Sequence, residues 1–160
     1  MRLTVYSDLS LRVLMYVGLH PDGRPTIAEV AASYGVSKNH LMKVVYQLGV
    51  AGYVTTSRGK HGGLRLARAA AEIGLGELVR RTEPDLALAP CFGPESAAAC
   101  PIAPVCKLRR ALWEARSAFL DVLDGYTLAD LVENRAPLQE LLTIHRASSA
   151  LAPPVLGPGS

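Results

Sequence analysis

Apolar residues in the N-terminal half recur at the spacing of amphipathic helices, with turn residues between the helices. The first apolar stripe runs over residues 11–19 and follows Ser7, a residue type that caps helices. It stops at residues 20–23, His-Pro-Asp-Gly, which form a turn signature. The pattern predicts a first helix that Ser7 caps and that ends before this turn.

Two further helices with a tight turn between them follow. Thr26 and Glu29 have the spacing of a capping box, in which the two side chains bond each other's backbone N–H groups. This second helix breaks at residues 34–36, Tyr-Gly-Val, and Ser37 then caps a third helix over residues 38–49. A short helix, a glycine-containing turn and a longer amphipathic helix predict a helix-turn-helix.

A glycine-rich hairpin follows the third helix. Residues 53–57 and 63–67 alternate between polar and apolar types as strands do, and residues 58–62, Arg-Gly-Lys-His-Gly, join them. A hairpin in this place is the wing of a winged helix. The sequence therefore predicts a mainly α fold, with a winged helix-turn-helix DNA-binding domain over residues 1–80.

The charge distribution adds a partner to this fold. Residues 30–71 contain no Asp or Glu, although the net charge of the whole chain is only +3. An acid-free basic stretch of this length favours a polyanion such as double-stranded DNA. The alternative is that these charges only solvate a small helical domain. The predicted DNA contacts are Ser37, Lys38, Asn39, His40, Lys43, Arg58, Lys60 and His61, with Gln47 at the edge of the helix face.

Length and composition narrow the class of protein. A chain of 160 residues with 49% hydrophobic and 19% charged residues suits one modest core with an oligomerisation element, and argues against a large two-domain enzyme. No apolar run reaches the roughly 18 residues that span a bilayer, and the first residues lack a signal-peptide pattern. We therefore expect a cytoplasmic protein without a membrane partner. In that compartment cysteines serve as thiolate ligands or redox thiols rather than as disulfides.

The three cysteines fall in a segment that cannot be one helix. Five prolines interrupt residues 82–104, so these residues are expected to form a loop. Cys91 and Cys100 are separated by eight residues, and Cys100 and Cys106 by five. Prolines and small residues suit a stiff loop wrapped on an iron-sulfur cluster, where few side chains crowd the inorganic sulfides. We predict a cluster-binding loop over residues 81–106.

Two other uses of these thiols stay open on spacing alone. Structural zinc sites use ligand pairs about two to four residues apart and a fourth Cys or His. This chain has no such pair and no His near the cysteines, because its histidines are His20, His40, His61 and His145. The remaining alternative is three buried or redox-active thiols without a metal.

The C-terminal part is predicted to be mainly helical. An amphipathic stretch covers residues 106–123, a short helix follows over residues 128–133, and residues 138–147 continue helically. A helix this long beside a small domain needs a partner for its apolar stripe, most economically a second copy of the chain. We predict dimerisation helices within residues 104–147 and a disordered tail over residues 148–160. The apolar stripe consists of Leu108, Leu112, Ala115, Phe119, Val122 and Leu123.

Several motifs occur in an order that resembles a known family. They are Ser7-Asp8, Thr-Ile-Ala-Glu-Val-Ala at 26–31, Val-Ser-Lys-Asn-His-Leu at 36–41, Gly-Lys-His-Gly-Gly at 59–63 and the three cysteines. This combination, over about residues 1–135, resembles the iron-sulfur winged-helix transcription regulators, the family that includes NsrR and IscR. Residues 106–108 and 126–131 look most like its nitric-oxide-sensing NsrR subgroup. Arg109 stands where IscR-type members have a His, and the eight-residue gap is longer than the family's usual five.

The resemblance implies a homodimeric repressor that binds operator DNA and is not an enzyme. It places an iron-sulfur cluster, 4Fe-4S or alternatively 2Fe-2S, on Cys91, Cys100 and Cys106, with the partner subunit's Asp8 as the fourth ligand. Nitric oxide is then expected to destroy the cluster and release the DNA. On local chemistry alone, Asp8 is a carboxylate at a helix N-terminus that pairs with Arg12.

Three other functions compete with this expectation. The first two are regulators with the same DNA-binding module, controlled by iron through a cluster or by zinc or thiol redox state. The third, less favoured, is a cluster carrier or redox enzyme. For that third function the sequence lacks a second cofactor motif, a catalytic dyad and a phosphate loop.

Overall fold

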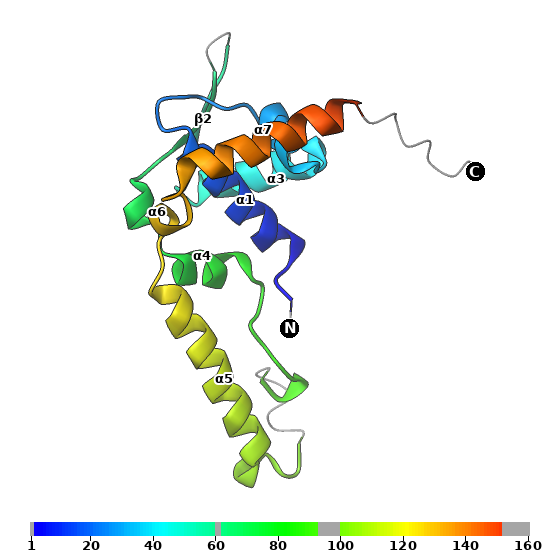
Figure 1. Ribbon diagram of the computed structural model, residues 1–160. Coiled ribbons are helices and arrows are strands. Elements are labelled where there is room, and N and C mark those ends of the chain that lie inside the picture. The colour runs from blue at the N-terminus through cyan, green and yellow to red at the C-terminus, as the bar shows by residue number, and fades with distance from the viewer. Residues whose placement is uncertain (1, 60–61, 93–99, 152–160) are drawn as a thin grey trace, which may run out of the picture.

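The computed structural model describes residues 2–59, 62–92 and 100–151, which form a helical head and one long helix that projects from it (Figure 1). Short 3₁₀ turns lie between some of the main elements. In chain order the elements are α1 (Val5–Leu19), α2 (Ile27–Tyr34), α3 (Lys38–Val50), β1 (Val54–Ser57), β2 (Gly63–Leu66), η1 (Ala70–Glu72), α4 (Leu75–Thr82), η2 (Pro90–Phe92), η3 (Ala103–Val105), α5 (Lys107–Asp124), α6 (Leu128–Leu131) and α7 (Arg135–Leu151).

The first helix begins earlier than its sequence pattern predicts. Its N-cap is Thr4, whose hydroxyl accepts the Ser7 N–H at 3.2 Å, so the prediction of Ser7 as the cap is wrong. Ser7 is instead buried, and its hydroxyl donates to Thr82 Oγ1 at 2.7 Å. A hydroxyl that makes this tertiary hydrogen bond joins the first turn of α1 to the last turn of α4.

The helix-turn-helix forms as predicted. Thr26 and Glu29 make both hydrogen bonds of the capping box, with Thr26 N–H donating to Glu29 Oε2 at 2.8 Å. Gly35 ends α2 in the left-handed conformation, with φ of 62°. Ser37 then occupies the N-cap position of α3, although its side chain makes no cap hydrogen bond.

The wing is a two-stranded antiparallel sheet. β1 pairs with β2 so that Ser57 lies opposite Gly63, as the alternating pattern predicted. The Leu64 N–H donates to the Pro25 carbonyl at 2.9 Å and fixes the second strand to the loop before α2. The predicted wing residues Lys60 and His61 lie outside the described residues.

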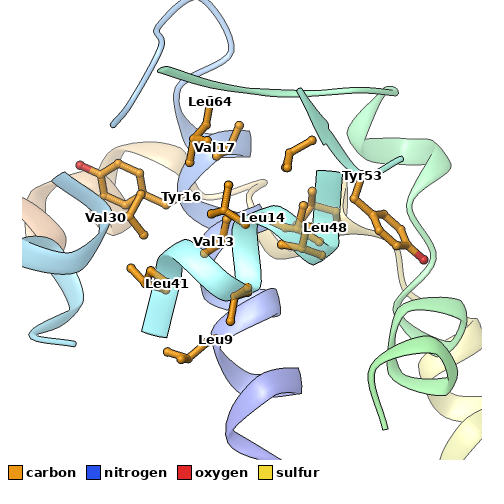
Figure 2. Packing of buried hydrophobic residues seen from close by; sticks show 14 of the residues in the cluster. Leu9, Val13, Leu14, Tyr16, Val17, Val30, Leu41, Leu48, Tyr53 and Leu64 are labelled. Carbon is orange, nitrogen blue, oxygen red and sulfur yellow. The ribbon is translucent and has the colours of Figure 1, made fainter. Parts of the chain in front are cut away.

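The core gathers around α1. In Figure 2, Val13 and Leu14 of α1 lie beside Leu41 and Leu48 of α3, and all four are fully buried. Leu78 of α4 completes the same core, although the pattern did not predict this helix, which runs two residues past the expected domain boundary at residue 80.

The chain returns to the head after α5. Leu128 of α6 is fully buried in the core, and Gln139 of α7 donates to the Leu19 carbonyl at 2.7 Å. Residues 125–143 therefore pack on the head, and α5 is the part of the predicted dimerisation region that stands apart. α7 also runs to Leu151, four residues into the predicted tail, while residues 152–160 lie outside the described residues.

A polar joint connects α5 to the head at its C-terminal end. Arg80 of α4 donates two hydrogen bonds of 2.6 Å to the Asp124 carboxylate. Gly76 leaves room for that carboxylate, because a Cβ at this position would overlap it. The Leu75 N–H donates to the Tyr126 carbonyl at 2.9 Å beside this pair. The joint sets the direction in which α5 leaves the head.

Replacing Gly35 by Ala is expected to lower the free energy of unfolding by about 1–2 kcal/mol, because an L side chain is strained in the left-handed conformation. Gly49→Ala is the matched control, since an added Cβ there meets only an ordinary contact and Ala favours a helix by up to about 1 kcal/mol. Urea unfolding followed by circular dichroism measures both variants. Equal effects at the two positions would contradict the strained turn at Gly35.

Candidate DNA interface and cysteine site

The exposed side of α3 carries the helix residues predicted to contact DNA. Its buried stripe consists of Leu41, Val44, Val45 and Leu48. Helical geometry puts Asn39 and Lys43 on the opposite side, where they point away from the core. The predicted contacts that the structure leaves exposed here are Ser37, Lys38, Asn39, His40 and Lys43, and Gln47 is exposed as well.

The two flanks of α3 have different neighbours. A Cβ on Gly49 would lie 3.8 Å from the Val54 carbonyl oxygen, which places the wing along that flank. On the other flank, His40 and Gln47 line a cavity of about 730 Å³ with the start of α1 and the end of α4. The helix α3, which would be the recognition helix of the predicted helix-turn-helix, thus lies between the wing and the N-terminal turn of α1.

The wing extends the cationic surface beyond α3. Arg58 is exposed at the described edge of the wing tip, and the other two predicted contacts, Lys60 and His61, fall outside the described residues. Thr55 and Arg65 lie opposite each other across the strand pair, and both are exposed. Arg65 is therefore a further exposed cation on the wing.

Large apolar side chains also lie on the exposed side of α3. Met42, Tyr46 and Val50 are 50%, 73% and 73% exposed. Their four-residue spacing puts them in one row along the helix. These three residues were not among the predicted DNA contacts, because those contacts were chosen by polar and charged type. The sequence signal that could have found them is their position around the helix, because helical geometry puts them on another side of α3 from the buried stripe.

A hydrogen-bonded cluster joins the base of the wing to α4. Glu77 Oε1 accepts from Tyr53 Oη and from Arg68 Nη2, both at 2.9 Å. The hydrogen bond from Arg68 is the main cause that lowers the pKa of Glu77, and the Tyr53 hydroxyl adds to it. Burial and the hydrogen bond to Glu77 raise the pKa of Tyr53 to about 12. The cluster fixes the wing relative to α4, from which the cysteine segment departs.

The three cysteines are half-buried free thiols on the segment between α4 and α5. Cys91 lies in η2, and the Cys100 carbonyl accepts the Ala103 N–H at 3.1 Å. Cys106 is the N-cap of α5, and its Sγ accepts the Arg109 N–H at 3.4 Å. The Cys106 thiol therefore lies at the N-terminal end of α5.

A cationic cavity of about 600 Å³ lies beside Cys106. The Arg116 guanidinium stacks over the Phe92 ring, 5.3 Å from its centroid, and both side chains line this cavity. Such a lining suits an anionic group, because several cations meet there and none of the described lining residues is acidic. The charged lining residues are Lys107, Arg109, Arg110 and Arg116.

The structure places the thiols on one segment without gathering them. Within residues 2–59, 62–92 and 100–151, no three His, Cys, Asp or Glu side chains come together as metal ligands. Residues 93–99, between Cys91 and Cys100, lie outside the described residues. Ligation of a cluster by Cys91, Cys100 and Cys106 therefore stays a prediction.

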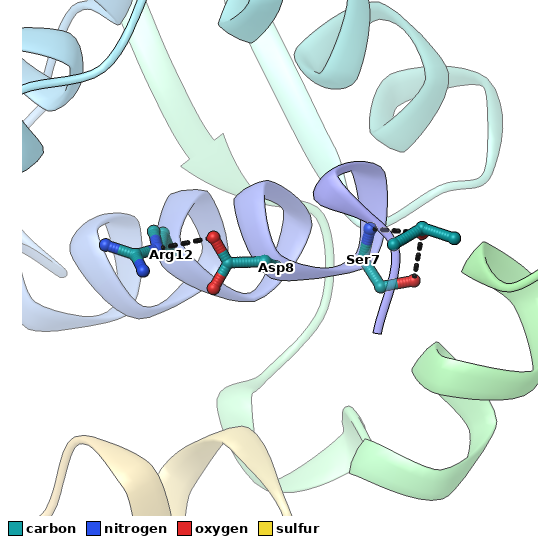
Figure 3. Close-up of polar contacts among 4 residues, drawn as sticks. Ser7, Asp8 and Arg12 are labelled. Atoms are coloured by element: carbon teal, nitrogen blue, oxygen red, sulfur yellow. Dashed lines mark hydrogen bonds and ion pairs between the residues drawn. The ribbon is translucent and has the colours of Figure 1, made fainter. Parts of the chain in front are cut away.

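Asp8 lies in the first turn of α1 and pairs with Arg12 one turn further along (Figure 3). Arg12 Nε lies 2.8 Å from Asp8 Oδ2, and both side chains are about half exposed. The local pairing expected from the sequence is present. The second expected role of Asp8, as a ligand donated to the partner subunit, stays a prediction.

The described helices contain no candidate for a membrane-spanning segment. Residues 3–134 match the Rrf2 family, which is described as iron-dependent transcriptional regulator. The chain belongs to the Rrf2 family. This result confirms the resemblance to the regulators that include NsrR and IscR.

Individual relatives agree with the family assignment. This Rrf2 protein is 49% identical over 147 residues to the HTH-type transcriptional regulator NsrR of Geobacillus kaustophilus (strain HTA426), over 91% of this chain and 99% of that protein. It shares its fold with T. potens IscR, with a TM-score of 0.66 and 23% identity over 87% of this chain and 91% of that chain. CymR (YrzC), the global cysteine regulator of B. subtilis, has a TM-score of 0.67 and 24% identity over 84% of this chain and 98% of that chain.

These findings set the class of function. The Rrf2 protein is a DNA-binding transcriptional regulator and not an enzyme, because its family and its relatives are transcriptional regulators. The mainly α fold with a winged helix-turn-helix is likewise confirmed.

Glu77→Gln is expected to lower stability at neutral pH and to lose this effect in acid. A carboxylate whose folded-state pKa is lowered contributes stability above its ordinary value of 4.5, and that stability is lost as the pH falls through the lowered pKa. Urea midpoints measured from pH 7 down to about pH 3 test this linkage. Glu140→Gln, on the exposed side of α7, is the control. A difference between wild type and Glu77→Gln that does not change with pH would contradict it.

Proposed function

We propose that this Rrf2 protein is a cytoplasmic, homodimeric repressor that binds operator DNA and senses nitric oxide through an iron-sulfur cluster, whose loss or nitrosylation releases the DNA. The observation that carries the proposal is the position of the three free thiols, on the segment that joins the DNA-binding head to α5. A group held there lies between the two parts of the chain. The likeness of residues 106–108 and 126–131 to the nitric-oxide-sensing subgroup supports the signal.

The donor set of the chain fits such a cluster. Cys91, Cys100 and Cys106 offer three thiolates, the soft ligands on which iron-sulfur clusters depend. The partner subunit's Asp8 offers a harder oxygen ligand, and this ligand set suits a 4Fe-4S cluster, with 2Fe-2S as the alternative. The cations beside Cys106 offset negative charge at this site. When bound, the cluster supplies iron that reacts with nitric oxide, most readily at the oxygen-ligated corner.

The exposed side of α5 supports the homodimer. No residue of α5 is buried in its own chain, and the predicted apolar stripe divides into two sides. Leu112, Phe119 and Leu123 are half-buried, while an exposed seam alternates in steps of three and four residues, as coiled-coil seams do. A second copy of α5 covers such a seam most economically, and its small central residues let two helices approach closely. The seam consists of Leu108, Ala111, Ala115, Ala118 and Val122.

Polar contacts connect the cysteine segment with the head. Glu83, the first residue of the segment, accepts the N–H and the hydroxyl of Thr4 at 2.9 and 3.1 Å. The pair of Arg80 and Asp124 connects the C-terminal end of α5 to α4 of the head. A displacement of the segment therefore acts on α1, which packs directly on α3. Two recognition helices in a dimer match DNA half-sites about 34 Å apart, so a small rotation of one against the other weakens binding.

A second candidate is a regulator of the same fold that responds to iron, zinc or thiol redox state. One observation favours the thiol-controlled form of this candidate: the described residues bring no three metal-ligating side chains together. Thiols that are oxidised separately need no shared ligand geometry. The family assignment removes the redox enzyme from the alternatives.

Protein reconstituted with iron and sulfide without oxygen is expected to absorb broadly in the visible range and to bind its operator. Added nitric oxide is expected to bleach the absorption and release the DNA in parallel. Cys91→Ala, Cys100→Ala and Cys106→Ala should each abolish the absorption and keep a folded dimer, because these residues lie outside the hydrophobic core. Absorption, metal and sulfide analysis and DNA binding are measured on the same samples. Zinc without sulfide, or DNA binding that nitric oxide leaves unchanged, would favour the second candidate.

Asp8→Ala is expected to shift the visible spectrum of the reconstituted protein and to weaken operator binding, because it removes the proposed oxygen ligand. Arg12→Gln is the matched control: it breaks the same ion pair but keeps the carboxylate. Loss of an exposed pair of this kind costs only about 0.3–0.5 kcal/mol. Identical spectra for wild type and Asp8→Ala would leave Asp8 with its structural role alone.

Ala115→Glu is expected to convert the dimer to a monomer at micromolar concentration, because the dimer would bring two like charges together at the centre of the seam. Ser117→Glu adds the same charge on another side of α5 and is the control. Sedimentation equilibrium gives the mass of each variant. A monomeric wild type, or a dimer that survives Ala115→Glu, would place the dimer interface elsewhere.

A further inference from the structure

The row of exposed apolar side chains on α3 is not explained by cations that hold phosphates. Met42 and Tyr46 are 50% and 73% exposed, and they lie one turn apart on α3, the helix predicted to contact DNA. Exposed apolar side chains that follow one another along a helix mark a contact surface more often than isolated ones do. The surface therefore needs an occupant.

The position of the row points to the groove side of the helix. Gly49 marks the flank of α3 nearest to the wing, and helical geometry puts Met42 and Tyr46 between that flank and Lys43. Asn39 lies beside Met42 one turn earlier, and both Asn39 and Lys43 are exposed. The apolar row is thus flanked by side chains of the types that contact bases and phosphates.

Two occupants could cover this row, a second copy of the chain or duplex DNA, and charge favours the DNA. Residues 30–71 contain no acidic residue, so two copies that met through this same face would bring cations against cations. The same copy already has an apolar seam to cover on α5. Duplex DNA is complementary in charge, and its major groove also presents an apolar group, the C5-methyl of thymine.

We propose that Met42 and Tyr46 contact thymine C5-methyl groups in the major groove and so make this protein select thymine at those positions. The proposal rests on DNA binding through α3. Met is unbranched and adapts its side chain to a small methyl group, and the flat Tyr ring covers a neighbouring one. Val50 belongs to the same row but lies at the C-terminal end of α3, and recognition helices contact base edges with their N-terminal residues.

Replacement of thymine by uracil tests the proposal, because it removes the methyl group alone. Wild-type dimer first selects duplexes from a random pool, and each thymine of the selected site is then replaced in turn. At the contacted positions uracil is expected to weaken binding about fourfold, the effect of one buried methyl group. Met42→Ala or Tyr46→Ala should weaken binding to the thymine duplex similarly and make that position insensitive to uracil.

Two control variants separate this effect from a general loss of binding. Val50→Ala, equally exposed in the same row, should leave both affinity and the uracil effect unchanged. Lys43→Ala should weaken binding to all duplexes alike and reduce its salt dependence, as the loss of a phosphate contact does.

The possible failures are distinguishable. Uracil effects that persist undiminished in Met42→Ala and Tyr46→Ala, or that are absent in the wild type, would overturn this inference alone. A change of mass in these two variants would show that the row is a protein contact and would also overturn it. If the wild type enriched no duplex, the DNA interface on α3 would fail together with the inference.

Discussion

Burial of α1 is the constraint on which the rest of the structure depends. Nine of its fifteen residues are buried, and it packs against α2, α3, α4, α6, α7 and β2. Protein interiors are close-packed, so a shift of such a helix is not absorbed locally but moves its neighbours. Ser7 ties the first turn of this helix to Thr82, where the cysteine segment begins. One buried hydrogen bond thus connects the start of the candidate sensor with the packing of the recognition helix.

The long helix α5 contrasts with α1 in how its own chain holds it. It has no buried residue in its own chain and is held at its C-terminal end by the exposed Arg80–Asp124 pair. Exposed ion pairs contribute little to stability, because water and salt screen them. The joint with α4 sets the direction of α5 in the single chain, and in the proposed dimer a partner that covers the seam would hold the helix more firmly. In the proposed switch, a cluster held between the packed head and α5 would therefore act on a helix that has no buried residue in its own chain.

Local chemistry explains which parts of the fold the sequence predicts. The capping box of Thr26 and the glycine at residue 35 act within a few residues, and the helix-turn-helix was predicted from them correctly. The cap of α1 was predicted wrongly because the Ser7 hydroxyl donates a hydrogen bond to Thr82, a residue 75 positions away, instead of capping the helix. The docking of α6 and α7 on the head depends on Leu128 and Gln139 contacts with α1, which no local pattern contains.

The candidate site also has features that the sequence predicts and features that depend on the fold. Charge along the chain was enough to predict Lys38, Lys43 and Arg58 as DNA contacts; the structure leaves all three exposed, and the contacts themselves stay a prediction. Met42 and Tyr46 were not among the predicted contacts because those were chosen by charge and polarity, although the spacing of the buried stripe already leaves both residues outside the core. Cysteine spacing predicted the segment but not a ligand geometry, because thiols on a proline-interrupted loop are brought into a ligand geometry only when such a loop binds a metal group.

Asp8 illustrates how a switch of this kind keeps its fold. In the single chain its carboxylate pairs with Arg12, a half-exposed contact worth about 0.3–0.5 kcal/mol. A metal–ligand bond is far stronger, so the pair does not oppose transfer of the carboxylate to a cluster in the proposed dimer. The start of α1 does not depend on Asp8 either, because Thr4 caps the helix and Ser7 anchors it. In the proposed switch, gain or loss of the cluster would therefore exchange the partner of the Asp8 carboxylate without melting the helix, and the displacement would pass to α3 through a core that stays intact.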